Sequence, residues 1–171
     1  AAHANLSKDE LKLIKDLNLL TIKPFIFVLN TGDNQLEDQQ NLGHNKISIA
    51  LNLKFESEIA EMDEVEAKEF ENESRLSNLI KTAYETLCLI TFFTTGEDET
   101  RGWTISAGWS APQAGSAIHN DFEQNFIKAE VINWQKLLEC GSWSSAREKG
   151  MLRVEGRDYI VRDGDVIEFK I

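Results

Sequence analysis

The first apolar residues of the chain recur at helical spacing. Ser7 and Glu10 form an S-x-x-E capping-box signature before them, and such a signature marks the start of a helix. Pro24 disfavours helical backbone at the residue before it, so we expect the helix to end by about Thr21. Its apolar positions are Leu11, Ile14 and Leu17.

Two strand-length apolar segments follow. Residues 25–29 form an uninterrupted apolar run, which is typical of a strand covered on both faces in a parallel sheet. Turn residues stop this run at positions 30–33, and the polar, glycine-containing residues 31–46 predict a loop. Along residues 47–53, Ile47, Ile49, Leu51 and Leu53 alternate with other residues, which predicts a second strand.

The rest of the first half predicts helices. Residues 56–73 hold nine carboxylates against Lys68 alone, a pattern typical of a solvated helix face. A second helix is predicted where Leu76, Leu79, Ile80, Ala83 and Leu87 share one side. Two strands are too few to enclose a core, so we expect this half to expose apolar surface unless something covers it.

From about Cys88 the pattern changes to short strands and tight turns. Periodicity alone predicts an α+β arrangement of mixed strands around one or two short helices. The expected elements are a hairpin of residues 90–94 and 101–105 around Gly96-Glu97-Asp98, a loop at 111–114, a turn at 118–122, a strand at 126–132, a helix at 134–140, a pairing of 152–154 with 159–161, and a strand at 166–171.

Composition narrows the class of protein. The chain has 171 residues, of which 42% are hydrophobic and 27% charged, as in soluble globular proteins. No apolar run approaches the ~20 residues of a membrane-spanning helix, and the first residues lack the pattern of a secretion signal. Cys88 and Cys140 lack metal-ligand spacing, which indicates reduced thiols in a cytoplasmic protein.

Charge argues against tight nucleic-acid binding by the whole surface. The formal net charge is -11, whereas binding to a phosphate backbone needs clustered cations. Nothing signals DNA recognition. A local basic strip is nevertheless one interpretation of the last residues; its members are Arg147, Lys149, Arg153, Arg157 and Arg162.

Hydrolysis of ATP or GTP by this chain alone is not expected. A phosphate loop needs G-x-x-x-x-G-K-[ST], because its backbone amides cradle the phosphates while the lysine reaches the terminal ones. The sequence contains no Gly-Lys pair. The candidate nucleotide element is instead Asn30-Thr31-Gly32-Asp33, at the end of the first predicted strand, where ligands bind in open α/β sheets. Ordinary turn chemistry is the alternative.

Other polar and aromatic residues have two interpretations each. His119 with Asp121 suggests catalysis or a metal site, but no third ligand accompanies them, so a histidine bonded to nearby backbone is favoured. We expect Trp103 and Trp134 in the core. Trp109 and Trp143 lie in predicted loops, either as exposed anchors for partners or as lids over the core.

One long segment resembles a known family. Residues 101–131 read RGWTISAGWSAPQAGSAIHNDFEQNFIKAEV, and the similarity continues through 152–161 and 163–167. This order of motifs resembles the TGS domain of YchF-type proteins, the Obg-related P-loop nucleotidases. The resemblance implies an α+β chain, in which residues 1–87 form the C-terminal portion of a P-loop G domain and residues 88–171 form a β-grasp TGS domain.

The resemblance also implies site residues. Asn30 and Asp33 would read the purine base, and the loop at Asn52 and Leu53 would approach it. YchF-type proteins carry Asn-x-x-Glu where this chain has Asn-x-x-Asp, so the choice between ATP and GTP stays open. The implied TGS interaction surface comprises Trp109, Pro112, Gln113, His119, Asp121 and Lys128.

Two functions follow from this resemblance. In the first, the chain is the C-terminal fragment of a cytoplasmic ribosome- or RNA-associated NTPase. The missing part of that protein would supply the phosphate loop. ATP or GTP with Mg²⁺ is therefore implied for the parent protein, and no cofactor is implied for the fragment alone. In the second, the chain is a stand-alone TGS module that binds RNA, ribosome or a protein partner.

Overall fold

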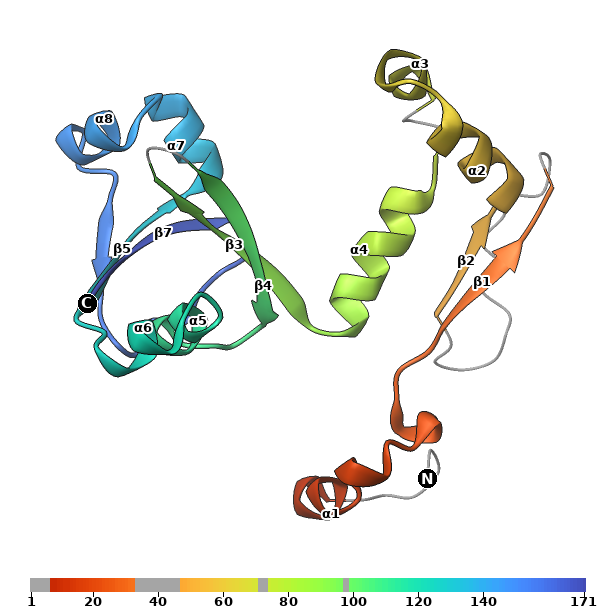
Figure 1. Ribbon diagram of the computed structural model, residues 1–171, viewed down its shortest axis with the longest axis horizontal. Coiled ribbons are helices and arrows are strands. Elements are labelled where there is room, and N and C mark those ends of the chain that lie inside the picture. Colours follow the sequence, from red (N-terminus) through yellow and green to blue (C-terminus); the bar gives the residue numbers. More distant parts are fainter. Residues whose placement is uncertain (1–6, 33–46, 71–73, 97–98) are drawn as a thin grey trace. The chain divides into compact units, whose positions relative to one another are not determined.

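The computed structural model describes residues 7–32, 47–70, 74–96 and 99–171 (Figure 1). It divides into two units, Ala1–Thr86 and Leu87–Ile171. The loop predicted at 31–46 lies largely outside the described residues.

The first unit opens with a short helix, α1 (Lys8–Leu13). The predicted capping box is confirmed, because Ser7 N–H donates to Glu10 Oε2 over 2.8 Å and Glu10 N–H donates to Ser7 Oγ over 3.3 Å. The predicted length is wrong. Two 3₁₀ turns, η1 (Lys15–Leu17) and η2 (Leu20–Ile22), replace the expected continuation. Asn18, with φ of 47°, leaves the right-handed helical region between them.

The two predicted strands are β1 (Ile26–Asn30) and β2 (Ile47–Leu51), and they pair in parallel as expected. The expectation that both faces are covered is wrong within this unit, because Phe27 and Val28 are 39% and 40% exposed. The second strand also ends before Leu53. The Asn52 side chain accepts a hydrogen bond from Phe55 N–H, which starts a helix at Leu53 instead.

Three helices complete the first unit: α2 (Leu53–Glu61), α3 (Glu64–Glu69) and α4 (Leu76–Thr86). The single long acidic helix expected from the sequence is therefore two shorter ones. Asp63 separates them, because its carboxylate accepts hydrogen bonds from Val65 and Glu66 N–H and so begins α3.

The second unit contains a five-stranded mixed sheet. Its strands are β3 (Leu89–Thr95), β4 (Thr100–Ser106), β5 (Lys128–Asn133), β6 (Arg153–Glu155) and β7 (Asp165–Lys170). They lie in the order β4-β3-β7-β5-β6. The β3–β7 pair is parallel and the other pairs are antiparallel. The predicted 90–105 hairpin is confirmed as β3 and β4.

Helices cover both faces of this sheet (Figure 1). They are α5 (Ala111–Ser116), α6 (Asn120–Gln124), α7 (Trp134–Cys140) and α8 (Trp143–Glu148). Neighbouring residues of β5 face opposite ways, so Val131 packs with Ala111 and Ala114 of α5, whereas Ile132 packs with Ala146 of α8. The unit therefore has a core on each side of its sheet.

Two of the segments expected in this unit differ in the structure. The predicted loop at 111–114 is helix α5, because Gln113 Oε1 accepts hydrogen bonds from Ser110 N–H and Oγ–H and caps the helix. Residues 159–161 do not pair with 152–154. They lie beside 109–111 through Ala111 N–H to Tyr159 O and Val161 N–H to Trp109 O, and β6 pairs with β5.

Candidate nucleotide-base site and interaction surface

The candidate base site lies at the carboxyl ends of β1 and β2. The parallel register pairs Asn30 with Leu51, so both strands end at the same edge of the sheet. Thr31 N–H donates to Leu51 O over 3.0 Å and continues the pairing by one residue. This edge is where ligands bind in open α/β sheets.

The Asn30 amide has a fixed orientation at this edge. Its Oδ1 accepts a hydrogen bond from Leu53 N–H over 3.3 Å. Because a backbone N–H can only donate, Oδ1 must face Leu53, and the Nδ2 group with its two donors faces away. Asn30 is exposed, and within the described residues no partner of Nδ2 is seen. The arrangement offers donors to an acceptor such as a purine ring nitrogen.

The other predicted base contacts have backbone roles. Asn52 caps α2 by accepting from Phe55 N–H over 3.2 Å. Leu53 contributes its N–H to Asn30, while its side chain is 48% exposed. Asp33 lies outside the described residues. The structure thus brings Asn30, Asn52 and Leu53 together.

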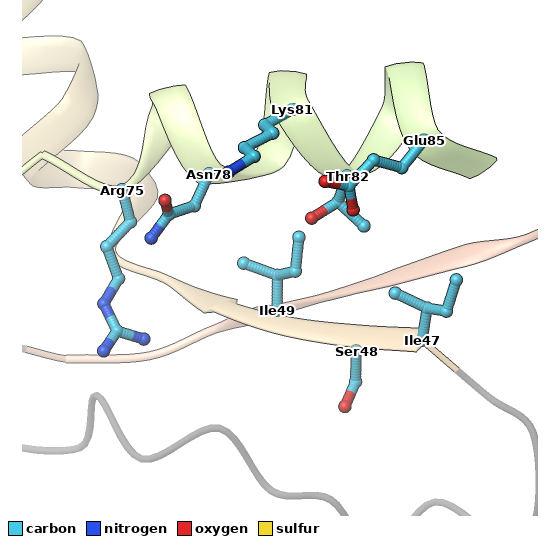
Figure 2. Close-up of a pocket in the computed structure, with 8 residues that line it drawn as sticks. All are labelled: Ile47, Ser48, Ile49, Arg75, Asn78, Lys81, Thr82 and Glu85. Carbon is cyan, nitrogen blue, oxygen red and sulfur yellow. The ribbon is translucent and has the colours of Figure 1, made fainter. Parts of the chain in front are cut away.

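A hollow of about 340 Å³ lies between β2 and α4 (Figure 2). Its lining residues are Ile47, Ser48, Ile49, Arg75, Asn78, Lys81, Thr82 and Glu85. Ile47 and Ile49 point toward α4, whereas Ser48 points away (Figure 2). Its charged lining residues are Arg75, Lys81 and Glu85. None of the predicted site residues lines this hollow.

The predicted TGS surface separates into core and exposed residues. Pro112 is buried, and Trp109 packs partly buried against the larger core. Gln113, His119, Asp121 and Lys128 are exposed. His119 Nδ1 accepts a hydrogen bond from Asp121 N–H over 3.2 Å and caps α6. The interpretation of His119 as a histidine bonded to nearby backbone is confirmed. In the described part of the chain no group of three His, Cys, Asp or Glu side chains could hold a metal ion.

The basic strip of the C-terminal residues is largely paired internally. Arg147 contacts Glu130 and Glu168, and Arg153 contacts Glu155 and Asp165. Arg157 donates to backbone, with Nη1 2.9 Å from Phe126 O. These guanidinium groups are engaged in the fold, which reduces what the strip offers to phosphates.

An apolar groove lies beside helices α7 and α8 of the second unit and was missed from the sequence. Its volume is about 890 Å³, and it lies between the end of the β3–β4 hairpin and helices α7 and α8. Trp134 is 44% and Leu138 71% exposed there, so the expectation of a core Trp134 is wrong. Trp143 begins α8 and packs partly buried against the smaller core. The i, i+4 spacing of Trp134 and Leu138 was the available signal.

A mixed sheet with helices on both faces and the matching family region define the second unit as a TGS-type α+β domain. Residues 89–171 match the YchF-GTPase_C family, described as "Protein of unknown function (DUF933)". The chain is similar over nearly its whole length to the C-terminal half of YchF and Obg-like ATPases. The resemblance predicted from the sequence is thus confirmed, as is the α+β fold class.

Several curated relatives are similar to this chain in sequence. The ribosome-binding ATPase YchF of Mycoplasma genitalium is 41% identical over 96% of this chain and 50% of that protein. The corresponding Bacillus subtilis protein is 39% identical over 99% and 51%, and Obg-like ATPase 1 of Schizosaccharomyces pombe is 34% identical over 96% and 46%. The chain therefore spans about half the length of these curated relatives.

Solved structures agree with this fold. The Schizosaccharomyces pombe YchF GTPase matches with a TM-score of 0.81 at 32% identity, over 98% of this chain and 49% of that one. A GTP-binding protein from Pyrococcus horikoshii OT3 matches with a TM-score of 0.54 at 17% identity, which supports the fold alone. Among the residues that the structure describes, no helix is long and apolar enough to cross a membrane.

Proposed function

We propose that this chain supplies the purine-recognition edge and a TGS interaction module to a cytoplasmic, ribosome- or RNA-associated ATPase or GTPase. In this proposal residues 1–87 are the C-terminal portion of the nucleotide-binding domain and residues 88–171 are the TGS domain. The phosphate loop and any Mg²⁺ ligands would lie outside these residues, so the chain alone would not hydrolyse nucleotide. Relatives named ribosome-binding ATPase support the proposal.

The observation that carries it is the Asn30 amide. Leu53 N–H holds Oδ1, and the amide lies at the common carboxyl edge of two parallel strands. Nδ2 then donates to a purine acceptor such as N7, which adenine and guanine share. Asn30 contributes to binding of both bases in this arrangement, and the choice between them would fall to other groups such as Asp33.

The test measures ATP and GTP affinity of the full-length protein with and without Asn30→Ala. We expect about tenfold weaker binding of both nucleotides, because one or two hydrogen bonds of about 1 kcal/mol each are lost. Asn78→Ala is the matched control, since Asn78 is also exposed but lies on α4 beside the polar hollow. Unchanged affinity for both nucleotides in Asn30→Ala removes Asn30 from the site.

The second candidate is a stand-alone interaction module. It is favoured by the exposed polar group of Gln113, His119, Asp121 and Lys128 and by the apolar groove. A salt titration separates the possible partners. Binding of RNA should weaken steeply as salt rises, because neutralised phosphates release counterions. Binding that changes little with salt would identify an apolar protein surface as the partner.

A further inference from the structure

Glu56 joins helix α2 to the start of helix α4. Its Oε1 accepts a hydrogen bond from Arg75 N–H over 2.7 Å, and its Oε2 accepts one from Ser74 Oγ–H over 2.6 Å. Both contacts are partly buried and span 18 and 19 residues of sequence. The first N–H groups of a helix lack intrahelical partners and attract negative charge. Glu56 therefore caps α4 from a different helix.

The same turn of α2 reaches the candidate base site. Glu56 N–H donates to Asn52 O over 3.0 Å, and Asn52 Oδ1 accepts from Phe55 N–H. Leu53 lies two residues before Phe55, at the start of the same helix, and its N–H donates to Asn30 Oδ1. The first turn of α2 thus contains both Leu53, which orients the Asn30 amide, and Glu56, which caps α4.

Other carboxylates of this acidic stretch are placed differently. Glu58 forms an exposed pair with Lys54 at 3.6 Å, four residues away on the same helix, and Glu61 at the end of α2 is exposed. Such pairs contribute little. Glu56 is half-buried and holds two donors from a distant segment, so the prediction of a uniformly solvated acidic face does not hold for it.

We infer that Glu56 is a positioning residue for nucleotide binding: it fixes the first turn of α2 against α4 and thereby holds the Asn30 amide toward the base. This inference rests on the proposed function of Asn30. Helix α4 ends at Thr86 and β3 begins at Leu89, so the anchored helix is also the covalent connection to the TGS-type unit.

The first test is independent of nucleotide and uses the 171-residue chain. Hydrogen exchange at the amides of Leu53 and Arg75 should be at least fivefold faster in Glu56→Ala than in the wild type. Glu56→Gln should restore most of the protection at Arg75, because its amide oxygen still accepts from Arg75 N–H. Glu61→Ala is the matched control and should leave both amides unchanged. Unchanged exchange at Leu53 in Glu56→Ala overturns the inference.

The second test measures nucleotide affinity in the full-length protein. Glu56→Ala should weaken binding about tenfold, and Glu56→Gln should restore it to within threefold of wild type. Because Glu56 acts through Asn30, Glu56→Ala should have little further effect when Asn30 is already alanine. Additive losses would show a merely structural role and overturn the inference. Should Glu56→Ala fail to fold, Ser74→Ala replaces it with the same expected non-additivity.

The outcomes separate the two proposals. Weaker binding in Asn30→Ala with normal binding in Glu56→Ala retains the base site and overturns the inference about Glu56. Normal binding in Asn30→Ala overturns the proposed base site, and the role of Glu56 in nucleotide binding falls with it. In that case faster exchange at Leu53 in Glu56→Ala still reports on the contact between α2 and α4.

Discussion

Asp165 is a buried carboxylate whose two oxygens accept hydrogen bonds from neighbouring donors. It is 2% exposed. Tyr159 Oη–H donates to Oδ2 over 2.6 Å, Arg162 N–H donates to the same oxygen over 2.9 Å, and Arg153 Nη2 donates to Oδ1 over 3.3 Å. A buried charge is tolerated when it is paired and hydrogen-bonded. This network fixes the turn that leads into β7.

The first prediction concerns Tyr159 at high pH. Burial, followed by the hydrogen bond to Asp165, raises the pKa of Tyr159 to about 12 from its ordinary value of 10.0. A raised folded pKa means that the stabilisation is complete below pH 10 and is lost as the pH rises through about 12. In Tyr159→Phe we expect a smaller unfolding free energy at neutral pH, by about 1–2 kcal/mol, and a shallower decline above pH 10.

Urea unfolding followed by tryptophan fluorescence measures this effect, because all four tryptophans lie in the second unit. Tyr84→Phe is the matched control, since Tyr84 belongs to the first unit. Parallel pH profiles for Tyr159→Phe and the wild type would contradict the prediction.

The second prediction compares two glycines with left-handed backbone. Gly164 has φ of 76°, and a Cβ there would lie 2.7 Å from Trp134 Cδ1. Gly141 has φ of 80° and no atom within 4 Å of the added Cβ. Gly141→Ala should therefore cost about 1 kcal/mol of backbone strain, whereas Gly164→Ala should cost about 2–4 kcal/mol because overlap with the indole is added.

Equal losses of unfolding free energy in the two variants would show that Trp134 moves aside freely. Adding Trp134→Ala to each variant completes the comparison. It should reduce the penalty at Gly164 and leave that at Gly141 unchanged.

At the residue scale, sequence reasoning succeeded where the chemistry is local. The capping role of Ser7 and the backbone bond of His119 involve partners within three residues, which the sequence displays directly. The prediction of a core Trp134 is wrong because a helix position alone does not say which face of the helix is covered. Its ring lies instead over Gly164 beside the groove, a neighbour thirty residues away.

At the scale of elements, Arg147 connects α8 to two strands. Its Nη2 lies 2.5 Å from Glu130 Oε2 on β5 and 3.8 Å from Glu168 Oε2 on β7. Glu130 has a side chain 13% exposed. The hydrogen bond from Arg147 holds the pKa of Glu130 below its ordinary value of 4.5, although burial opposes this.

The third prediction follows from that lowered pKa. A depressed folded pKa means that the stabilisation is present above pH 4.5 and is lost as the pH falls through the folded pKa. Glu130→Gln should lower the unfolding free energy at pH 7 by about 1 kcal/mol, and this difference should shrink toward pH 3. Glu139→Gln is the control, because Glu139 lies on α7 and is exposed. A difference that stays constant from pH 7 to pH 3 would exclude the ion pair as its cause.

Short elements account for most errors at this scale. Helix α5 has six residues, too few for a hydrophobic period to be recognised, and its cap depends on the Gln113 side chain. Strand β6 has three residues, and its partner β5 precedes it by two helices. The longer hairpin of β3 and β4 was predicted correctly because its two strands are neighbours in the sequence.

At the scale of the whole molecule, the two units differ in how well they bury apolar residues. Among the described residues, the first unit buries Ile49, Ala50 and Leu51, while Leu13, Leu20 and Val65 are 70% or more exposed. The second unit encloses two cores around its sheet. The expectation of exposed apolar surface in the first half is confirmed, because two parallel strands cannot cover their own faces.

The fourth prediction is that the units unfold separately. Burial of apolar area is the main stabilising contribution, so the first unit should open at lower free energy than the second. Brief proteolysis of the 171-residue chain should leave a resistant fragment that begins near Leu87 and carries all four tryptophans. The urea midpoint of its tryptophan fluorescence should equal that of the intact chain.

Phe92→Ala, which removes a fully buried ring, should cost about 3–5 kcal/mol and abolish the resistant fragment. Simultaneous degradation of both units in the wild type would instead show that they stabilise each other.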